Sequence, residues 1–387
     1  MKRIYMDHAA TTYVNDDVLK EMLPYFSEKF GNPSSLYFYG REAKAAIEKS
    51  REQVALAINA DVNEIIFTAG GSESDNTIIK SVAKLNKNKG NHIITCAIEH
   101  HAVLHTCAQL ESDGYEITYL PVNKEGLVSV EDLKNAITDK TILITIMTAN
   151  NEIGTIQPIE QIGKIAKEHN IVFHTDAVQA IGAVDIDVKK MNIDALSLSA
   201  HKFYGPKGIG ALYVRKGIKL YPLITGGAQE KNRRAGTEDV AGIVGLGKAI
   251  EIATQNINQH NARLTALRDD LIQKLLNSIP ECFVNGSMEH RLANNINMCF
   301  RYIEGEALLL SLDLKGVAAS SGSACTSGSL DPSHVLLALG LPHEVAHGSL
   351  RLTLGERTTQ EDIDYVAQEL PKIVTKLREW SPLYGQE

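Results

Sequence analysis

The chain has 387 residues, with 39 lysines and arginines against 47 aspartates and glutamates, and its formal net charge at pH 7 is −8. This length allows two or three compact domains around a large core. The acidic balance argues against nucleic acid or an anionic membrane surface as the main partner, so we expect small molecules or proteins instead.

The five cysteines are odd in number and scattered, and none belongs to a CxxC pair or a zinc-ribbon spacing. This usage is typical of a reducing cytoplasm and not of a disulfide framework. Asp7 and His8 appear before any apolar run, and no stretch of eighteen apolar residues follows. We therefore expect a cytoplasmic protein with no membrane span or targeting segment.

The first few dozen residues lack the rhythm of strands and end in a helical stretch, "GREAKAAIEKSREQVALAI". We expect them to pack against a second domain, with residues 1–20 as an N-terminal segment. From about residue 60 to 215, seven short apolar runs from "EIIFTAG" to "GIGALYV" alternate with longer helical stretches. The alternation predicts an α/β domain with a mostly parallel sheet.

Small or polar residues follow several of these runs directly. Since ligands bind at the carboxyl ends of parallel strands, we expect these clusters to form one active site. The clusters are residues 70–73, 99–101, 150–152, 176 with 179, and 199–202.

A long helical pattern beginning at "VAGIVGLGKAIEIATQ" leaves this domain and ends at Pro280. Strand and helix patterns then alternate to the end of the chain, which predicts a smaller α+β domain. The predicted division is an N-terminal segment 1–20, a large domain 21–255 and a small domain 256–387.

In "TAGGSESDN", an apolar strand ends in two glycines before Ser72 opens a helix. Free backbone N–H groups and a hydroxyl at a helix N-terminus make a phosphate cradle. A tight turn with a serine N-cap is the alternative for this stretch alone.

The stretch "CAIEHHAVLHTC" places His101 and His105 four residues apart, as zinc ligands sometimes are. The segment is predicted to pass from strand into helix, so its side chains point several ways. We therefore expect no metal site, and we expect Cys96 and Cys107 to be buried core residues.

In "SLSAHKFYGPKGIG", Lys202 follows a strand and has a hydroxyl and an imidazole beside it, on Ser199 and His201. This combination suits a lysine that holds pyridoxal phosphate (PLP) as a Schiff base, against the alternative of a solvated surface lysine. Asp176 ends the apolar strand of "FHTDAVQ", where a carboxylate needs a charged partner such as a protonated pyridinium nitrogen. A helix N-cap is the alternative role.

The stretch "SSGSACTSGSLDPSHVL" places Cys325 among serines and glycines. These residues do not build a core, so residues of about 320–333 are predicted to form a surface loop with an accessible thiol. The thiol is either reactive or an incidental surface cysteine.

The chain carries nine motifs in one order along essentially its whole length: "MDHAATT", "GNPSS", "TAGGSESDN", "NNEIG", "HTDAVQ", "SAHKFYGPKGIGALYV", "RRAGTED", "SSGSACTSG" and "LRLTLG". With them it resembles the cysteine desulfurases, the NifS- and IscS-like branch of the PLP-dependent fold-type I, or class V aminotransferase, family. The resemblance implies a large domain with a mostly parallel seven-stranded sheet and a smaller α+β domain.

The resemblance also implies the role of each site residue. Lys202 would hold the cofactor and act as base, Asp176 would pair with the pyridinium nitrogen, and Cys325 would be the nucleophile. His100 would stack on the ring and assist proton transfer, and Gln179 would bond the ring phenolate oxygen. The remaining residues would hold the phosphate (Gly71, Ser72, Ser199, His201 and, from a neighbouring subunit, Thr237) or the substrate carboxylate (Asn151 and Arg351).

The implied reaction removes sulfur from L-cysteine to give L-alanine and a persulfide on Cys325. A homodimer and a sulfur acceptor, either an iron–sulfur scaffold protein or a tRNA-thiolation enzyme, are implied as partners. The alternatives are a selenocysteine lyase, a PLP aminotransferase and a non-catalytic sulfur-relay protein. Three positions depart from the pattern: Tyr37 stands where many relatives carry histidine, and Ala228 and Asn232 stand where glycine is commoner.

Overall fold

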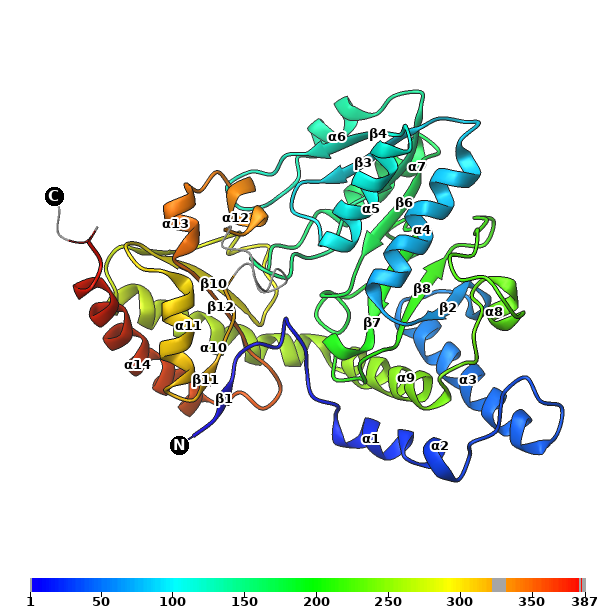
Figure 1. Cartoon of the computed structure of the whole chain (residues 1–387), viewed down its shortest axis with the longest axis horizontal. Helices are drawn as coiled ribbons and strands as arrows, with labels where there is room; N and C mark the ends of the chain where they lie inside the picture. The colour runs from blue at the N-terminus through cyan, green and yellow to red at the C-terminus, as the bar shows by residue number, and fades with distance from the viewer. Residues whose placement is uncertain (1, 322–331, 383, 385–387) are drawn as a thin grey trace.

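The computed structural model describes residues 2–321, 332–382 and 384. Figure 1 shows a large body built around a twisted sheet and a smaller body that carries the C-terminal third of the chain. The N-terminal strand lies on the smaller body, and the chain then crosses to the larger one. Among the described residues, no helix is both long and apolar enough to cross a membrane.

The large sheet has seven strands in the order β2-β8-β7-β6-β5-β3-β4. Only β8 runs antiparallel to its neighbours, so the prediction of a mostly parallel sheet is confirmed. Every residue of β3, β5, β7 and β8 is buried, as expected for strands covered on both faces. The strands are β2 (Ile65–Thr68), β3 (His92–Cys96), β4 (Glu116–Leu120), β5 (Thr141–Thr145), β6 (Val172–Asp176), β7 (Ala195–Ser199) and β8 (Gly210–Val214).

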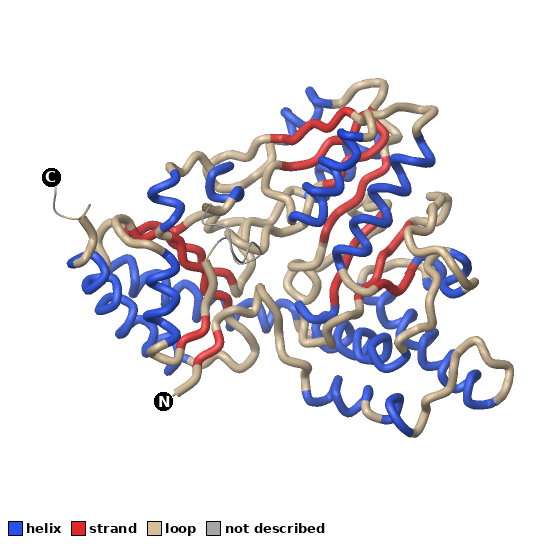
Figure 2. The backbone as a smooth tube through the Cα atoms, in the orientation of Figure 1, coloured by secondary structure: helices blue, strands red, loops and turns tan. Residues whose placement is uncertain are grey.

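Helices cover both faces of this sheet (Figure 2). One face packs against α4 (Gly71–Asn86) and α5 (His101–Ser112). The other packs against α3 (Phe38–Ala57), α6 (Val130–Ala136), α7 (Ile159–Glu168) and α9 (Val240–Gln255). The shorter elements of this body are α1 (Asp16–Met22), α2 (Pro24–Ser27), α8 (Gln229–Asn232) and the 3₁₀ turns η1 (Val62–Glu64) and η2 (Ala200–Lys202).

The smaller body contains an antiparallel sheet of order β12-β10-β9 and a parallel pair, β1 with β11. Its strands are β1 (Ile4–Tyr5), β9 (Cys282–Val284), β10 (Asn295–Phe300), β11 (Val317–Ala318) and β12 (Ser349–Thr353). Its helices are α10 (Ile257–Ser278), α11 (Gly305–Asp313), α12 (His334–Ala338), α13 (His343–His347) and α14 (Gln360–Glu379).

The long helical pattern after residue 239 is two helices, because Asn256 leaves helical geometry (φ −138°, ψ 40°) between α9 and α10. The predicted boundary between residues 255 and 256 falls at this break.

The expectation that the first few dozen residues pack against the second domain holds for Met6 to Ala9, which contact the core and β12 of the smaller body, and is wrong for the helices that follow. Helices α1 and α3 pack on α9 instead. Glycines on α9 allow the close approach: a Cβ at Gly245 would lie 2.6 Å from Sδ of Met22, and one at Gly247 would lie 2.7 Å from Cβ of Ser50.

Candidate active site

The polar clusters predicted from the sequence converge at the carboxyl ends of the strands. A Cβ built on Gly70, after β2, would lie 3.5 Å from Oγ of Ser199 at the end of β7. A Cβ on Gly71 would lie 2.6 Å from Cγ2 of Val178, which follows β6. Backbone from β2 therefore passes directly over residues that follow two other strands.

The first turn of α4 presents its backbone N–H groups without a side-chain cap. Its N-cap, Gly70, has φ of 152°, a conformation that side chains disfavour. Ser72 is exposed in the first turn, and Ser199 is 5% exposed at the end of β7. Uncapped N–H groups and nearby hydroxyls are the groups that bind a phosphate.

Lys202 lies in η2 and is held by the N-terminal segment. Its Nζ donates hydrogen bonds to the carbonyl oxygens of Ala9 (2.6 Å) and Ala10 (2.8 Å). Nε2 of Gln179 donates to the same Ala9 oxygen over 3.0 Å. The side chains of Lys202 and Gln179 therefore share an acceptor.

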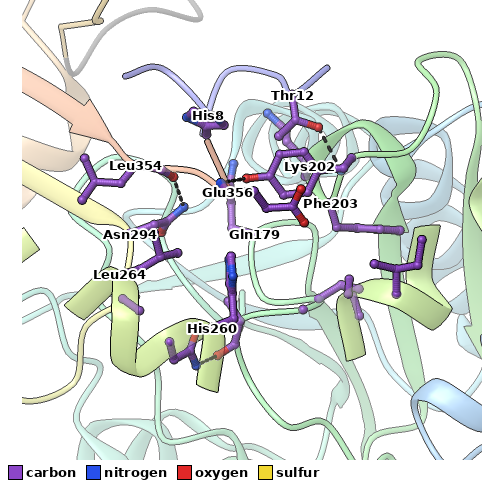
Figure 3. Close-up of a pocket in the computed structure, with 18 of the residues that line it drawn as sticks. His8, Thr12, Gln179, Lys202, Phe203, His260, Leu264, Asn294, Leu354 and Glu356 are labelled. Carbon is purple, nitrogen blue, oxygen red and sulfur yellow. Dashed lines mark hydrogen bonds between the residues drawn. The ribbon is translucent and has the colours of Figure 1, made fainter. Parts of the chain in front are cut away.

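A cavity of about 230 Å³ opens beside these two side chains, between the two bodies. Figure 3 shows Lys202 in its upper part and His260 of α10 below. Glu356 and Tyr204 also line it.

The same N-terminal segment holds His201. The His201 ring lies with Nδ1 3.0 Å from Oγ1 of Thr11, and the His201 carbonyl accepts from the backbone N–H (2.9 Å) and hydroxyl (3.0 Å) of Thr12. Burial lowers the pKa of His201 to about 4, and the charges of Lys202 and Lys207 contribute. The ring is neutral at pH 7 and keeps one N–H for hydrogen bonding.

Asp176 ends β6 and is 6% exposed. Burial raises its pKa to about 6, opposed by a hydrogen bond from the Val178 N–H (2.8 Å) and by the charge of Lys202. Two more carboxyl groups are buried near it, on Asp75 and Glu99, and each has one oxygen with no hydrogen-bond partner among the described residues. The surroundings of Asp176 are thus rich in carboxyl groups, which favours a bound cation.

His100 is the N-cap of α5, and its Nδ1 accepts a hydrogen bond from the Ala102 N–H over 3.1 Å. Burial lowers its pKa to about 4, with smaller contributions from the charges of Lys202 and His101. Because Nδ1 is an acceptor, the neutral ring carries its proton on Nε2.

Arg351 of β12 is 2% exposed. Its Nη2 donates to Oδ1 of Asp7 (2.9 Å) and its Nη1 donates to the backbone carbonyl of Asn151 (3.1 Å). Its Nε is buried with no hydrogen-bond partner among the described residues. The Nε–H therefore remains for a ligand, and a carboxylate is the group that a guanidinium prefers.

Two predicted site residues are not placed in this cluster. Thr237 is exposed after α8, although Arg234 of the same stretch bonds Glu73 in the first turn of α4 (2.9 and 3.2 Å). Cys325 lies outside the described residues. Of the residues that flank it, Ser320 donates to Oδ2 of Asp7 (2.8 Å), and the Ser333 hydroxyl donates to the carboxylate of Glu152.

The structure describes all three departures from the family pattern. Tyr37 is 60% exposed at the start of α3. Asn232 has φ of 63°, a left-handed conformation that glycine favours and asparagine tolerates. Ala228 has φ of −84°, which any residue adopts. The sequence therefore satisfies the backbone without glycine at either position.

The stretch that suggested zinc ligands packs its rings together. Among the described residues, no group of three or more histidine, cysteine or acidic side chains is arranged to hold a metal ion. Cys96 and Cys107 are fully buried in the core, as expected. The His101 ring instead packs against those of His105 (centroids 4.9 Å apart) and His334 (4.8 Å).

Sequence reasoning missed two site residues, Asp7 and Asp75. Asp7 belongs to the "MDHAATT" motif but gives no sign of its partner far along the chain. Asp75 stands on the fifth residue of α4, and its sequence neighbours do not show that it is buried.

The aminotransferase class-V family profile matches residues 4–366. The cysteine desulfurase IscS of Clostridium botulinum (strain Kyoto / Type A2) is 62% identical over 385 residues, which cover 99% of this chain and 97% of that protein. The cysteine desulfurase IscS of Methanosarcina thermophila is also 62% identical, over 386 residues, 100% of this chain and 95% of that protein.

Solved structures are similar over nearly the whole length. A NifS-like protein superposes with a TM-score of 0.92 at 39% identity and covers 97% of this chain and 100% of its own. SspA in complex with cysteine superposes with a TM-score of 0.82 at 42% identity, covering 91% of this chain and 99% of its own.

Proposed function

The chain belongs to the aminotransferase class-V family, and from this premise we propose that it is a PLP-dependent cysteine desulfurase. It takes sulfur from L-cysteine, releases L-alanine and keeps the sulfur as a persulfide on Cys325. The observation that carries this proposal is that Lys202 lies near His100 and Asp176 while Arg351 reaches the Asn151 carbonyl from β12, in a chain 62% identical to proteins named cysteine desulfurase.

The residues of the site fit PLP at its phosphate and at its ring nitrogen. The uncapped start of α4, with Ser72, Ser199 and His201, suits the phosphate. The buried carboxyl of Asp176 suits the ring nitrogen, because the orphaned oxygens nearby leave that region short of positive charge. When bound, PLP supplies a carbonyl carbon that condenses with amines and a ring that withdraws electrons from the bonds beside it.

The chain's own groups then have distinct tasks. Nε of Arg351 binds the substrate carboxylate while Asp7 and the Asn151 carbonyl keep the guanidinium in place. Nζ of Lys202 takes the Cα proton of the substrate after it leaves the Ala9 and Ala10 carbonyls. Nε2 of neutral His100 holds a proton for transfer, and Gln179 donates to the ring oxygen.

Cys325 completes the reaction. Its thiolate attacks the substrate sulfur, so an S–S bond forms while the C–S bond breaks. The carbon that loses sulfur gains a proton and leaves as L-alanine. The atoms balance without an external oxidant, because cysteine and an enzyme thiol become alanine and an enzyme persulfide.

One assay separates this function from its alternatives. The purified protein is expected to be yellow and to form alanine from L-cysteine in equal amount to the sulfur released. A selenocysteine lyase would act on selenocysteine and leave cysteine unused, and an aminotransferase would need a keto acid. A colourless protein that forms no alanine would leave only a sulfur-relay role and would contradict the proposal.

We propose a homodimer in which Thr237 reaches the phosphate of the neighbouring subunit. An exposed apolar cluster supports an interface: Phe26, Phe30, Tyr37 and Phe38 are 57–64% exposed and Leu36 is 91% exposed. Monomeric proteins rarely expose so many large apolar side chains together. Sedimentation of the PLP-loaded protein as an active monomer would contradict the dimer.

The persulfide requires an acceptor. We propose a protein acceptor, an iron–sulfur scaffold or a tRNA-thiolation enzyme, with no direct contact to nucleic acid. The cytoplasm is the proposed compartment, since Cys96, Cys107, Cys282 and Cys299 are all free thiols. Capture of partners on the persulfide-loaded protein from native cells tests which acceptor is used.

A further inference from the structure

Asp75 is a buried acid that the proposed mechanism does not use. It is 1% exposed in the first turns of α4, on the face that packs on the large sheet. Its Oδ1 has no hydrogen-bond partner among the described residues. No lysine or arginine of the described chain forms an ion pair with it, and the nearest basic atom is Nε2 of His174, 3.6 Å from Oδ1.

Among the described residues, the groups that act on Asp75 supply no positive charge. His174 and Asp176 face it from β6, and Glu99 lies after β3. Burial lowers the pKa of His174 to about 3, so its ring is neutral. The two neighbouring groups that can be charged are therefore carboxyls, and three buried carboxylates together would be costly.

Hydrogen bonds connect Asp75 to the strand that carries Asp176. The Ser197 hydroxyl interacts with the Asp75 carboxyl, which by itself lowers the pKa of that carboxyl, and it lies 3.0 Å from Nε2 of His174. Nδ1 of His174 lies 2.8 Å from Oγ1 of Thr145. Each hydroxyl in this series can donate or accept, so the series accommodates a proton on Asp75: Asp75 donates to Ser197, Ser197 to His174, and His174 to Thr145.

We propose that Asp75 holds a proton at neutral pH and thereby leaves Asp176 as the ionised carboxylate that faces the cofactor. Asp75 is then a positioning residue, which acts through Ser197 and His174 and does not touch the cofactor. The proposal rests on the proposed function only in taking Asp176 as the partner of the ring nitrogen. Burial, the largest cause, and the charges of Asp176 and Glu99 raise the pKa of Asp75 well above its usual value against the opposing Ser197 hydrogen bond, which supports the proposal.

The test is the pH dependence of thermal stability in the purified holoenzyme. A carboxyl with a raised pKa in the folded state loses stability as pH rises above its unfolded value, because the unfolded state releases a proton that the folded state keeps. Asp75→Asn removes this cost. The melting temperature of the variant minus that of the parent is expected to grow by at least about 3 °C from pH 5 to pH 8.

Two further variants sharpen the test. Asp113→Asn changes an exposed carboxyl after α5 and serves as the control. Its melting temperature is expected to differ from that of the parent by the same amount at every pH. In an Asp176→Asn background, Asp75→Asn is expected to change the melting temperature less steeply with pH, because one neighbouring carboxylate has been removed. A pH-independent difference for Asp75→Asn would overturn the proposal.

Cofactor affinity gives a second measurement that does not depend on turnover. With added PLP at pH 7, Asp75→Asn is expected to match the parent within about twofold. A tenfold loss of affinity would show that Asp75 carries a negative charge, and this too would overturn the proposal. A parent protein that binds no PLP would refute the proposed function. The melting experiment would still test whether Asp75 holds a proton.

Discussion

Nη2 of Arg351 lies 2.9 Å from Oδ1 of Asp7, 344 positions away in the sequence. Asp7 also accepts a hydrogen bond from Ser320, so one carboxylate connects the N-terminal segment to β11 and β12. With the Asn151 carbonyl on Nη1, this ion pair fixes the direction in which Nε of Arg351 points.

Asp7→Asn is expected to weaken binding of L-cysteine. The amide keeps the shape but loses the charge, so the guanidinium is held less firmly for the substrate carboxylate. We expect KM to rise about tenfold, a loss of about 1.4 kcal/mol, with kcat changed less than about twofold. Asp16→Asn removes a surface contact to Arg357 (3.5 Å) and serves as the control. Equal steady-state constants for Asp7→Asn and the parent would refute this role of Asp7.

Lys202→Ala is expected to abolish alanine formation, because no other residue of the site supplies both the cofactor linkage and the base for Cα.

Asp176→Ala is expected to keep part of the cofactor but to lose most of the rate, since an unprotonated ring attracts electrons poorly. Absorbance in the visible range and alanine release measure the two effects separately. Either variant working at the parent rate would contradict the cofactor assignment.

Cys325→Ser is expected to leave fold, dimer and PLP binding intact and to stop sulfur transfer. A hydroxyl is far less nucleophilic toward sulfur than a thiolate. The variant should still change its visible spectrum with L-cysteine but yield neither alanine nor sulfide. After one turnover, the parent should carry one reducible extra sulfur on the peptide with Cys325, seen by mass spectrometry. Extra sulfur found only on Cys96, Cys107, Cys282 or Cys299 would reassign the nucleophile.

Glu152 is expected to lower stability as pH rises toward neutrality. Burial raises its pKa from 4.5 to about 7, against the opposing Ser333 hydrogen bond and the charge of Arg351. Between these two pH values the unfolded state has released a proton that the folded state retains, so the free energy of unfolding falls as pH rises, by on the order of 3 kcal/mol in all.

Chemical unfolding of Glu152→Gln at several pH values measures this cost. The variant should lack the fall between about pH 4.5 and 7, and its difference from the parent should level off above pH 7. Ser333→Ala removes a hydrogen bond to the carboxylate and should extend the fall to higher pH. Parallel profiles for Glu152→Gln and the parent would show that the carboxyl is ionised throughout.

The sequence predicted the large sheet well because its signal is local. Each run from β2 to β8 is apolar and is followed by small or polar residues, so the strands and the clustering of Lys202, Asp176 and His100 near one edge follow from short patterns. The three-residue strand β9 and the five-residue helix α13 were not predicted from the sequence.

The parts that sequence reasoning could not supply depend on distant packing. The break at Asn256 interrupts a sequence pattern that predicts one helix. The glycines of α9 give no indication in the sequence that α1 and α3 pack against them. Asp7 and Asp75 read as ordinary polar residues until the fold places one beside Arg351 and buries the other. The carbonyl of Ala9, which accepts from both Lys202 and Gln179, has no side-chain signature at all.

The contacts of residues 7–12 also bear on when the site can form during synthesis. Residues 7–12 are translated early, yet their partners are Lys202, nearly two hundred positions later, and Arg351 near the end, while β1 waits for β11. Contacts between such distant positions form late because their loops must first close. Once β8 has emerged, the large sheet has all its strands and Ala9, Gln179 and Lys202 are present, but Arg351 and β11 come only later in the chain. A nascent chain that ends before residue 351 therefore lacks the arginine that Asp7 holds in the site.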